Sequence, residues 1–256
     1  MQVIPIKTRV MLPPKDDLWE VLDSALPKLR ERDVIVVTSK IVSIGEGRCI
    51  PVGTAKKKRA LIEREADYLA RFPENRRTVF SVKGHTIVGS AGIDESNSNG
   101  FWTLWPQKPF DSAKEIWWYL RKKHRLSQLG VIITDSTSPP MRLGCIGISI
   151  SFFGVHPLLR YIGKSDIFGR KFKFERSNLV DGIAAAAVVT IGEGDEQTPL
   201  AIVRDIPSLR FAPYDTRHEL LITPKQDIYY PLLKTLYEQK QKKADVRSRR
   251  GTKSGR

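Results

Sequence analysis

Short apolar runs alternate along the chain with longer stretches whose hydrophobic residues recur at helical spacing. The apolar, β-branched runs predict strands at residues 3–10, 34–42, 130–135, 145–155, 171–178 and 198–206. The amphipathic or small-sided stretches predict helices at residues 16–29, 58–72, 112–126, 180–192 and 226–240. Pro27 should end the first helix, and Ser112 with Glu115 forms a capping box at the start of the third. The pattern therefore predicts a mixed α/β (α+β) fold.

Three apolar runs lead into turns that combine an acid with glycine and polar residues. These turns are SAGIDESNSNG (90–100), the end of GVIITDSTSPPMRLG (130–144) and TIGEGDEQTP (190–199). Each turn alone has a local explanation, because Gly, Asp, Asn and Ser are ordinary turn residues. Their repeated design favours a shared role, in which Asp94, Asp135 and Glu193 converge on one site.

Such a site suits divalent cations and phosphate. Magnesium and manganese prefer oxygen ligands and are commonly held by one or two carboxylates together with phosphate oxygens. Ser136 adds a hydroxyl oxygen to the three acids, and the glycines around Glu193 allow backbone amides to approach phosphates. Four further residues have candidate roles: Ser39 and Lys40 at phosphate, Asn97 at a base or ribose, and Arg142 as a clamp for a charged substrate group.

Each of these residues also has a local interpretation. Asp135 alone is as readily a turn or helix-cap residue, Glu193 a solvated loop acid and Lys40 a surface charge. Common nucleotide and metal motifs do not account for the site. The GKS at 163–165 has Leu158 where a Walker A loop needs glycine, and neither G-x-G-x-x-G nor H-E-x-x-H occurs.

Length and charge restrict the class of protein. The 256 residues suffice for one large domain or two small ones, and the formal net charge is +15. Lys240–Arg256 carries eight Lys or Arg and one Asp, so seven of these charges belong to a segment without apolar periodicity. We expect one domain over residues 1–240 and a basic, disordered tail over residues 241–256, which could contact polyanions non-specifically. A nucleic-acid-binding module is the alternative that the charge supports.

The expected compartment is the cytoplasm. The two cysteines, Cys49 and Cys145, are too few for a disulfide framework. The amino terminus has no secretory signal pattern, and no apolar run is long enough to span a bilayer.

In order along the chain, VIVVTSKIVSIGEGR (34–48), SAGIDESN (90–97), GVIITDS (130–136), IGISISFFGVHPLLRYIGKSDIFGR (146–170) and DGIAAAAVVTIGEGDEQTPLAIVR (181–204) resemble the coenzyme F-420-0:L-glutamate ligases, or γ-glutamyl ligases. The resemblance runs from about Ile4 to Ile206. It implies a two-lobed mixed α/β fold that forms an intertwined homodimer.

The resemblance also implies an activity. The γ-phosphate of GTP would pass to a carboxylate of a cofactor precursor, and L-glutamate would then attack the acyl phosphate to form an amide. Divalent magnesium or manganese, two ions by expectation, and potassium would assist. Carried onto this sequence, the resemblance places the metal ligands at Asp94, Asp135, Ser136 and Glu193. It places nucleotide contacts at Arg9, Val10, Met11, Leu12, Ser39, Lys40, Asn97, Ile191, Gly192, Gly194, Asp195, Glu196, Gln197 and Thr198.

Two positions depart from the family pattern. Ile44 stands where the family usually has a nucleotide-contacting Lys, and Ser136–Pro139 replaces a T-x-G-R segment after the second acid, so that only Arg142 remains nearby. The acceptor is therefore left open between an F-420 precursor and a folate-like molecule. A relative that binds nucleotide without catalysis is a further alternative.

Overall fold

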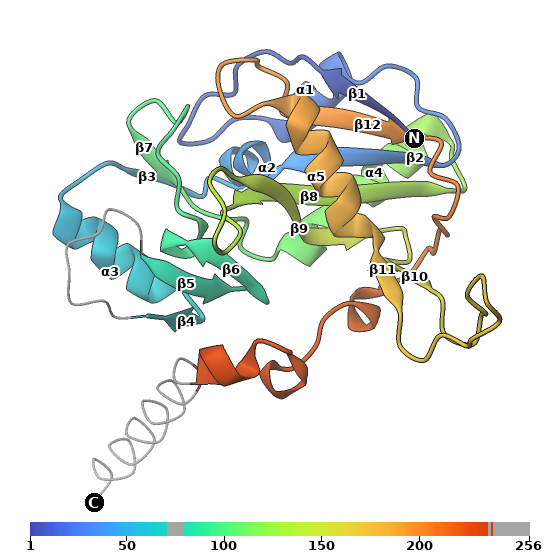
Figure 1. Cartoon of the computed structure of the whole chain (residues 1–256). Helices are drawn as coiled ribbons and strands as arrows, with labels where there is room; N and C mark the ends of the chain where they lie inside the picture. Colours follow the sequence, from blue (N-terminus) through green and yellow to red (C-terminus); the bar gives the residue numbers. More distant parts are fainter. Residues whose placement is uncertain (71–78, 235–236, 238–256) are drawn as a thin grey trace, which may run out of the picture. The chain divides into compact units, whose positions relative to one another are not determined.

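The computed structural model describes residues 1–70, 79–234 and 237. The expected tail at 241–256 and residues 238–240 of the last predicted helix lie outside these ranges. The chain divides into two compact units, Met1–Gly53 with Gly92–Leu220 and Thr54–Ala91 with Leu221–Arg256. Figure 1 shows the elements of both units. The predicted mixture of helices and strands is confirmed; the two-lobed dimer stays a prediction.

The first unit is built on a five-stranded sheet in the order β1-β12-β2-β8-β9. Its strands are β1 (Gln2–Ile6), β12 (Leu200–Arg204), β2 (Asp33–Thr38), β8 (Leu129–Thr137) and β9 (Ile146–Phe153). Only β2 and β8 pair in parallel, and the other neighbours in this sheet are antiparallel. The central strands are apolar because helices cover both of their faces.

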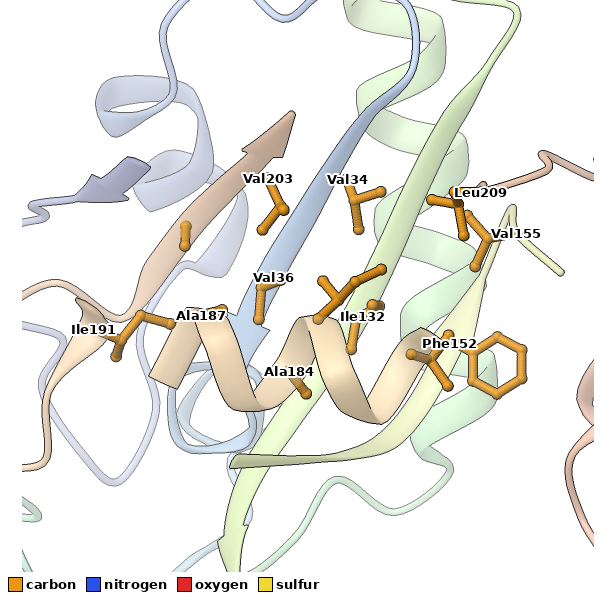
Figure 2. Packing of buried hydrophobic residues seen from close by; sticks show 13 residues of the cluster. Val34, Val36, Ile132, Phe152, Val155, Ala184, Ala187, Ile191, Val203 and Leu209 are labelled. Atoms are coloured by element: carbon orange, nitrogen blue, oxygen red, sulfur yellow. The ribbon is translucent and has the colours of Figure 1, made fainter. Parts of the chain in front are cut away.

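One face of this sheet packs against helix α5 (Leu179–Ile191), as Figure 2 shows. Val34 and Val36 of β2 lie under the helix and are fully buried. The helix meets them with Ala184 and Ala187, whose small side chains allow its backbone to come close to the strands. Behind the other face lies α4 (Pro109–His124). Burying one Val or Ile side chain in this way contributes about 1.5–3 kcal/mol.

The parallel pair determines where the acid turns can meet. In β2 and β8 the carboxyl ends lie at the same edge of the sheet, with Thr38 opposite Thr134. Helix α2 (Ser39–Gly45) follows β2 at once, and Asp135 follows Thr134. The register between β8 and β9 shifts between Ile133 and Thr134, where β9 has the extra residue Ile150, so the ladder is irregular one residue before Asp135.

The remaining elements are short. The first unit also contains α1 (Leu18–Ala25), the pair β3 (Cys49–Pro51) and β7 (Phe101–Thr103), the pair β10 (Leu158–Arg160) and β11 (Arg176–Asn178), and a 3-10 turn at Arg217–Glu219. The second unit contains α3 (Ala55–Glu65), the sheet β4 (Tyr68–Leu69), β5 (Phe80–Lys83) and β6 (Thr86–Gly89), and a 3-10 turn at Pro224–Gln226. A 3-10 turn at Ser90–Gly92 joins the two sequence segments. Among the described residues no helix is long and apolar enough to cross a membrane.

Three predictions of local structure were wrong. The strand expected over 34–42 ends at Thr38, because Ser39 already begins α2. Ser112 does not cap α4: the helix begins at Pro109, and the Ser112 hydroxyl donates to Glu46 (2.6 Å) and to the carbonyl of Lys108 (3.2 Å). Only Arg176–Asn178 of the strand expected at 171–178 is a strand.

Helix boundaries differ from the predictions in a similar way. The helix expected over 58–72 lies at Ala55–Glu65, where Thr54 caps it and Tyr68–Leu69 follows as a strand. The first helix ends at Ala25, before Pro27. In the last predicted helix, the described helical residues begin at Tyr230, so Pro231 lies in the first turn, where proline is tolerated.

Candidate functional site

A pocket of about 780 Å³ lies where β2 and β8 end, entirely within the first unit. Five parts of the chain line it: the segment after β1, the start of α2, the turn around Asp94, the end of β8, and the end of α5 with the loop that follows it. It includes every metal and nucleotide residue that the sequence analysis selected: Arg9, Val10, Met11, Leu12, Ser39, Lys40, Asp94, Asn97, Asp135, Ser136, Ile191, Gly192, Glu193, Gly194, Asp195, Glu196, Gln197 and Thr198.

The turn at Asp94 is closed by its own carboxylate. One Asp94 oxygen accepts the backbone N–H groups of Glu95 (2.6 Å) and Ser96 (2.9 Å). The other oxygen accepts the Ser96 hydroxyl (2.8 Å) and lies 2.6 Å from the Lys40 ammonium. Desolvation raises the pKa of Asp94, but the Lys40 charge and these hydrogen bonds outweigh it, so the net pKa is lowered. Asp94 is therefore ionised at neutral pH.

Asp135 lines the same pocket but is more shielded from water than Asp94. Its Oδ1 accepts the backbone N–H of Ser136 (2.9 Å), and its Oδ2 accepts the indole Nε1–H of Trp105. Burial raises the pKa of Asp135 to about 6, and the two hydrogen bonds only partly offset that effect. Charging this carboxylate is costly without a nearby cation, which is the electrostatic character expected of a cation ligand.

The loop after α5 contributes the third acid. The Ser136 hydroxyl donates to Glu193, so the ends of β8 and α5 meet through these side chains. Gly192 has φ +82, a backbone conformation that favours glycine, and a Cβ there would also displace the flexible Glu196 carboxyl group, which lies 2.2 Å away. The loop is fastened to the sheet edge because the carbonyls of Gln197 and Pro199 accept the N–H groups of Thr8 and Thr38, both at 3.0 Å.

Asn97 connects this loop to the first acid turn. Its side-chain amide donates to the carbonyl of Gly194 (2.7 Å).

Cys145 contacts Glu193, and desolvation together with that carboxylate raises the pKa of the Cys145 thiol. A thiol in this state is a poor nucleophile, so Cys145 is unsuited to covalent catalysis at this pocket.

Arg9 is fully engaged beside the pocket. Its guanidinium forms two hydrogen bonds to Asp16 (2.7 and 2.9 Å) and an ion pair with Glu20. Asp16 also accepts the N–H of Leu12 (2.8 Å). This network fixes the conformation of the segment from Arg9 to Leu12. Arg9 therefore contributes to the pocket by holding this segment in place.

The pocket is strongly acidic although the whole chain is basic. Five carboxylates line it, against the cations Lys40 and Arg9, both of which are paired with acids. The acidic lining residues are Asp94, Asp135, Glu193, Asp195 and Glu196. In the described part of the chain, no three His, Cys, Asp or Glu side chains form a ready-made metal cluster. The donor set nevertheless fits hard cations that take their remaining ligands from water and phosphate.

Arg142 is the one selected residue that does not line the pocket. It lies in an exposed turn after β8, where its backbone N–H donates to the carbonyl of Pro139 (3.3 Å). Several lining residues were missed, among them Ile41, Ser96, Asn99, Thr134 and Val188. Ser96 and Asn99 belong to the polar turn that the sequence analysis had already singled out. The apolar residues and Trp105 carry no sequence signal for a site.

Comparison with known proteins identifies the class. The family model described as "F420-0:Gamma-glutamyl ligase" matches residues 5–205. The chain belongs to this family, as its motifs suggested.

Curated relatives agree with the family model. A protein named "Coenzyme F420:L-glutamate ligase" from Methanopyrus kandleri is 31% identical over 253 residues, covering 90% of this chain and 96% of the relative. Proteins of the same name from Archaeoglobus fulgidus (29% identical, 91% of this chain, 98% of the relative) and Methanothermobacter thermautotrophicus (32%, 75% and 84%) also match. The family places the protein among ligases that add glutamate.

Proposed function

We propose that this protein is a GTP- and divalent-metal-dependent ligase that joins L-glutamate to a carboxylate of an F420-0-type precursor. In the first step an acceptor carboxylate oxygen attacks the γ-phosphorus of GTP, the bond to the β,γ-bridging oxygen breaks, and GDP leaves. In the second step the glutamate amine attacks the acyl carbon, expels inorganic phosphate and loses a proton. The products are an amide, GDP and phosphate.

The observation that carries the proposal is the single pocket that gathers the acids of all three turns. Its volume of about 780 Å³ is in the range of small-molecule sites. Apolar side chains occupy part of the lining and suit a purine ring: Val10, Met11, Leu12, Ile41, Ile44 and Val188. Ile44 replaces a cation with an apolar contact, so nucleotide affinity here relies more on apolar contacts to the base and on metal-bridged phosphate.

The acidic lining explains why metal would be required. A nucleoside triphosphate carries several negative charges, and five carboxylates facing it would repel it in the absence of cations. Asp94, Asp135, Ser136 and Glu193 would hold magnesium or manganese, which neutralises charge on the transferring phosphoryl group when bound. Potassium would add a further weakly held charge.

The protein itself mainly binds and orients. Phosphoryl transfer needs positioning and charge neutralisation and no protein nucleophile. Lys40, 2.6 Å from Asp94, is positioned to move to a phosphate oxygen once a metal ion satisfies that carboxylate. Arg142, in the exposed turn that follows β8, is proposed to bind the acceptor carboxylate or glutamate.

A homodimer is part of the proposal. The segment between β10 and β11 is an ordered projection whose Asp166 accepts the N–H groups of Phe168 and Arg170, both at 2.9 Å. Its tip exposes Ile167 (92%) and Phe168 (89%), which is unusual for side chains of this size facing water. Contact with a second copy would bury them. Ile167→Asp with Phe168→Asp should convert a dimer to a monomer in sedimentation experiments, and an unchanged mass would oppose this role.

The activity is tested by competition. Purified protein is mixed with GTP, manganese, labelled L-glutamate and equal amounts of an F420-0 precursor and a folate monoglutamate. We expect label in the F420-0 precursor, with one phosphate released per glutamate added, and less product when ATP replaces GTP. Label in the folate monoglutamate alone would show that the acceptor is folate-like and not the F420-0 precursor. GTP hydrolysis without labelled product would refute both acceptors, and no GTP turnover under any condition would favour a non-catalytic relative.

A further inference from the structure

The indole of Trp105 lies between two of the three acid turns. Trp105 is 2% exposed, and its Nε1–H donates to Oδ2 of Asp135. On the side of the first acid turn it fills the space next to Gly92, where a Cβ would lie only 2.2 Å from the indole nitrogen. Gly92 has φ +70, a conformation that glycine adopts without strain.

The chain segment that carries Trp105 also fixes the position of Asp94 through backbone hydrogen bonds. Asp94 and Thr103 exchange two backbone hydrogen bonds, from Asp94 N to Thr103 O (3.0 Å) and from Thr103 N to Asp94 O (2.8 Å). Two residues further on, the carbonyl of Trp105 accepts the Nε–H of Arg48 (3.1 Å). The segment Thr103–Trp105 thus fixes one acid through its backbone and the other through a side chain.

These contacts determine how the Asp135 carboxylate is oriented. Each oxygen accepts one N–H, from Ser136 on one side and from Trp105 on the other. Two donors on opposite oxygens fix the plane of the carboxylate and leave each oxygen a free lone pair for a cation. In metal sites such outer hydrogen bonds orient the ligand, and their loss typically lowers metal affinity or activity 10–100-fold.

We propose that Trp105 is a positioning residue of the cation site, which it serves through the hydrogen bond from its indole nitrogen to Asp135. The inference rests on the proposed function, because it assumes that Asp135 binds a divalent ion. A buried indole N–H needs an acceptor in any fold, and at Trp105 that acceptor is the carboxylate of the proposed cation site.

A matched residue separates positioning from packing. Trp117 is 1% exposed in the same unit, and its Nε1–H also donates a hydrogen bond, to the carbonyl of Leu129 at 2.7 Å. Trp105→Phe and Trp117→Phe each remove an indole and one hydrogen bond from a buried position. General loss of packing should affect both variants, whereas loss of the Asp135 donor affects only the first.

Direct manganese binding measures the effect without turnover. Free Mn²⁺ is followed by electron paramagnetic resonance in the presence of a non-hydrolysable GTP analogue. We expect Trp105→Phe to weaken Mn²⁺ binding about tenfold and Trp117→Phe to change it less than about twofold. In activity assays the manganese KM should rise for Trp105→Phe, while the glutamate KM stays within about twofold.

A second replacement isolates the hydrogen bond. Benzothienylalanine at position 105 keeps nearly the shape of tryptophan but has sulfur in place of N–H, so it should weaken Mn²⁺ binding as Trp105→Phe does. Equal Mn²⁺ affinity of this protein and the wild type, or equal effects of the two Phe variants, would overturn the inference while leaving the proposed function intact. A wild-type protein that binds no Mn²⁺ would overturn both.

Discussion

Replacing Asp135 by Asn should change how stability depends on pH. In the folded protein, burial raises the pKa of this carboxyl to about 6, against an ordinary value of 3.8. The unfolded chain therefore loses the proton at lower pH than the folded protein does. Between these two values the free energy of unfolding falls as pH rises, and above pH 6 the full penalty remains. The difference between the two pKa values corresponds to about 3 kcal/mol.

Asn lacks this titration but introduces a constant cost. Its amide nitrogen cannot accept a hydrogen bond, so either Trp105 or Ser136 loses its acceptor, at about 1–3 kcal/mol. Asp135→Asn should therefore be the less stable protein near pH 4. Between pH 4 and pH 7 the free energy of unfolding of Asp135→Asn should rise by about 2–3 kcal/mol relative to that of the metal-free wild type. At pH 7 the variant should therefore be at least as stable as the wild type.

The measurement is urea unfolding of both proteins without metal at several pH values between 4 and 7.5. Asp111→Asn, which removes an exposed carboxylate from the first turn of α4, controls for the loss of one charge. Mn²⁺ with a GTP analogue should stabilise the wild type and have little effect on Asp135→Asn. A free-energy difference between wild type and Asp135→Asn that is the same at every pH would refute the assigned burial of this carboxyl.

Three other predictions concern the pocket and the tail. Asp94→Asn and Glu193→Gln should each lower metal-dependent turnover more than about 100-fold, since direct ligands should matter more than their outer partners. The circular dichroism spectrum should change little. Full activity in both variants would exclude these residues as ligands. Lys40→Met should raise the pKa of Asp94, because the ammonium that lowers it is gone, and should weaken GTP binding about tenfold by calorimetry; unchanged GTP affinity would exclude a phosphate contact. Truncation after Lys240 should leave turnover within about twofold and reduce retention on heparin, because the removed segment is rich in Lys and Arg; loss of turnover would show that it serves the enzyme.

Much of the site could be read from the sequence because strand ends leave a clear pattern. Asp94, Asp135 and Glu193 each follow an apolar run, and the parallel pairing of β2 with β8 places Ser39 and Asp135 at one edge. The helix of small residues before Glu193 was predicted almost to the residue, because its seven small and apolar residues from Ile183 to Val189 are consecutive. These features depend on local periodicity, which a single sequence preserves.

The features that could not be predicted depend on contacts between distant segments. Nothing in LWP at 104–106 indicates that Trp105 donates to Asp135, thirty residues later. The sequence also gives no sign that Arg9 pairs with Asp16 and Glu20, because only the family resemblance placed Arg9 at the nucleotide. Ser112 shows the converse error: a capping pattern was present, but Glu46 provides a different partner in the folded chain.

The alanines of α5 have a consequence for how this protein can change. Ala184 and Ala187 set the depth at which the helix lies on the sheet, and the loop bearing Glu193 begins where that helix ends. A larger side chain at either alanine would lift the helix and carry Glu193 away from Ser136. The interior of the first unit and its reaction site therefore cannot be redesigned separately. An attempt to stabilise the protein by filling this layer would also disturb the proposed cation site.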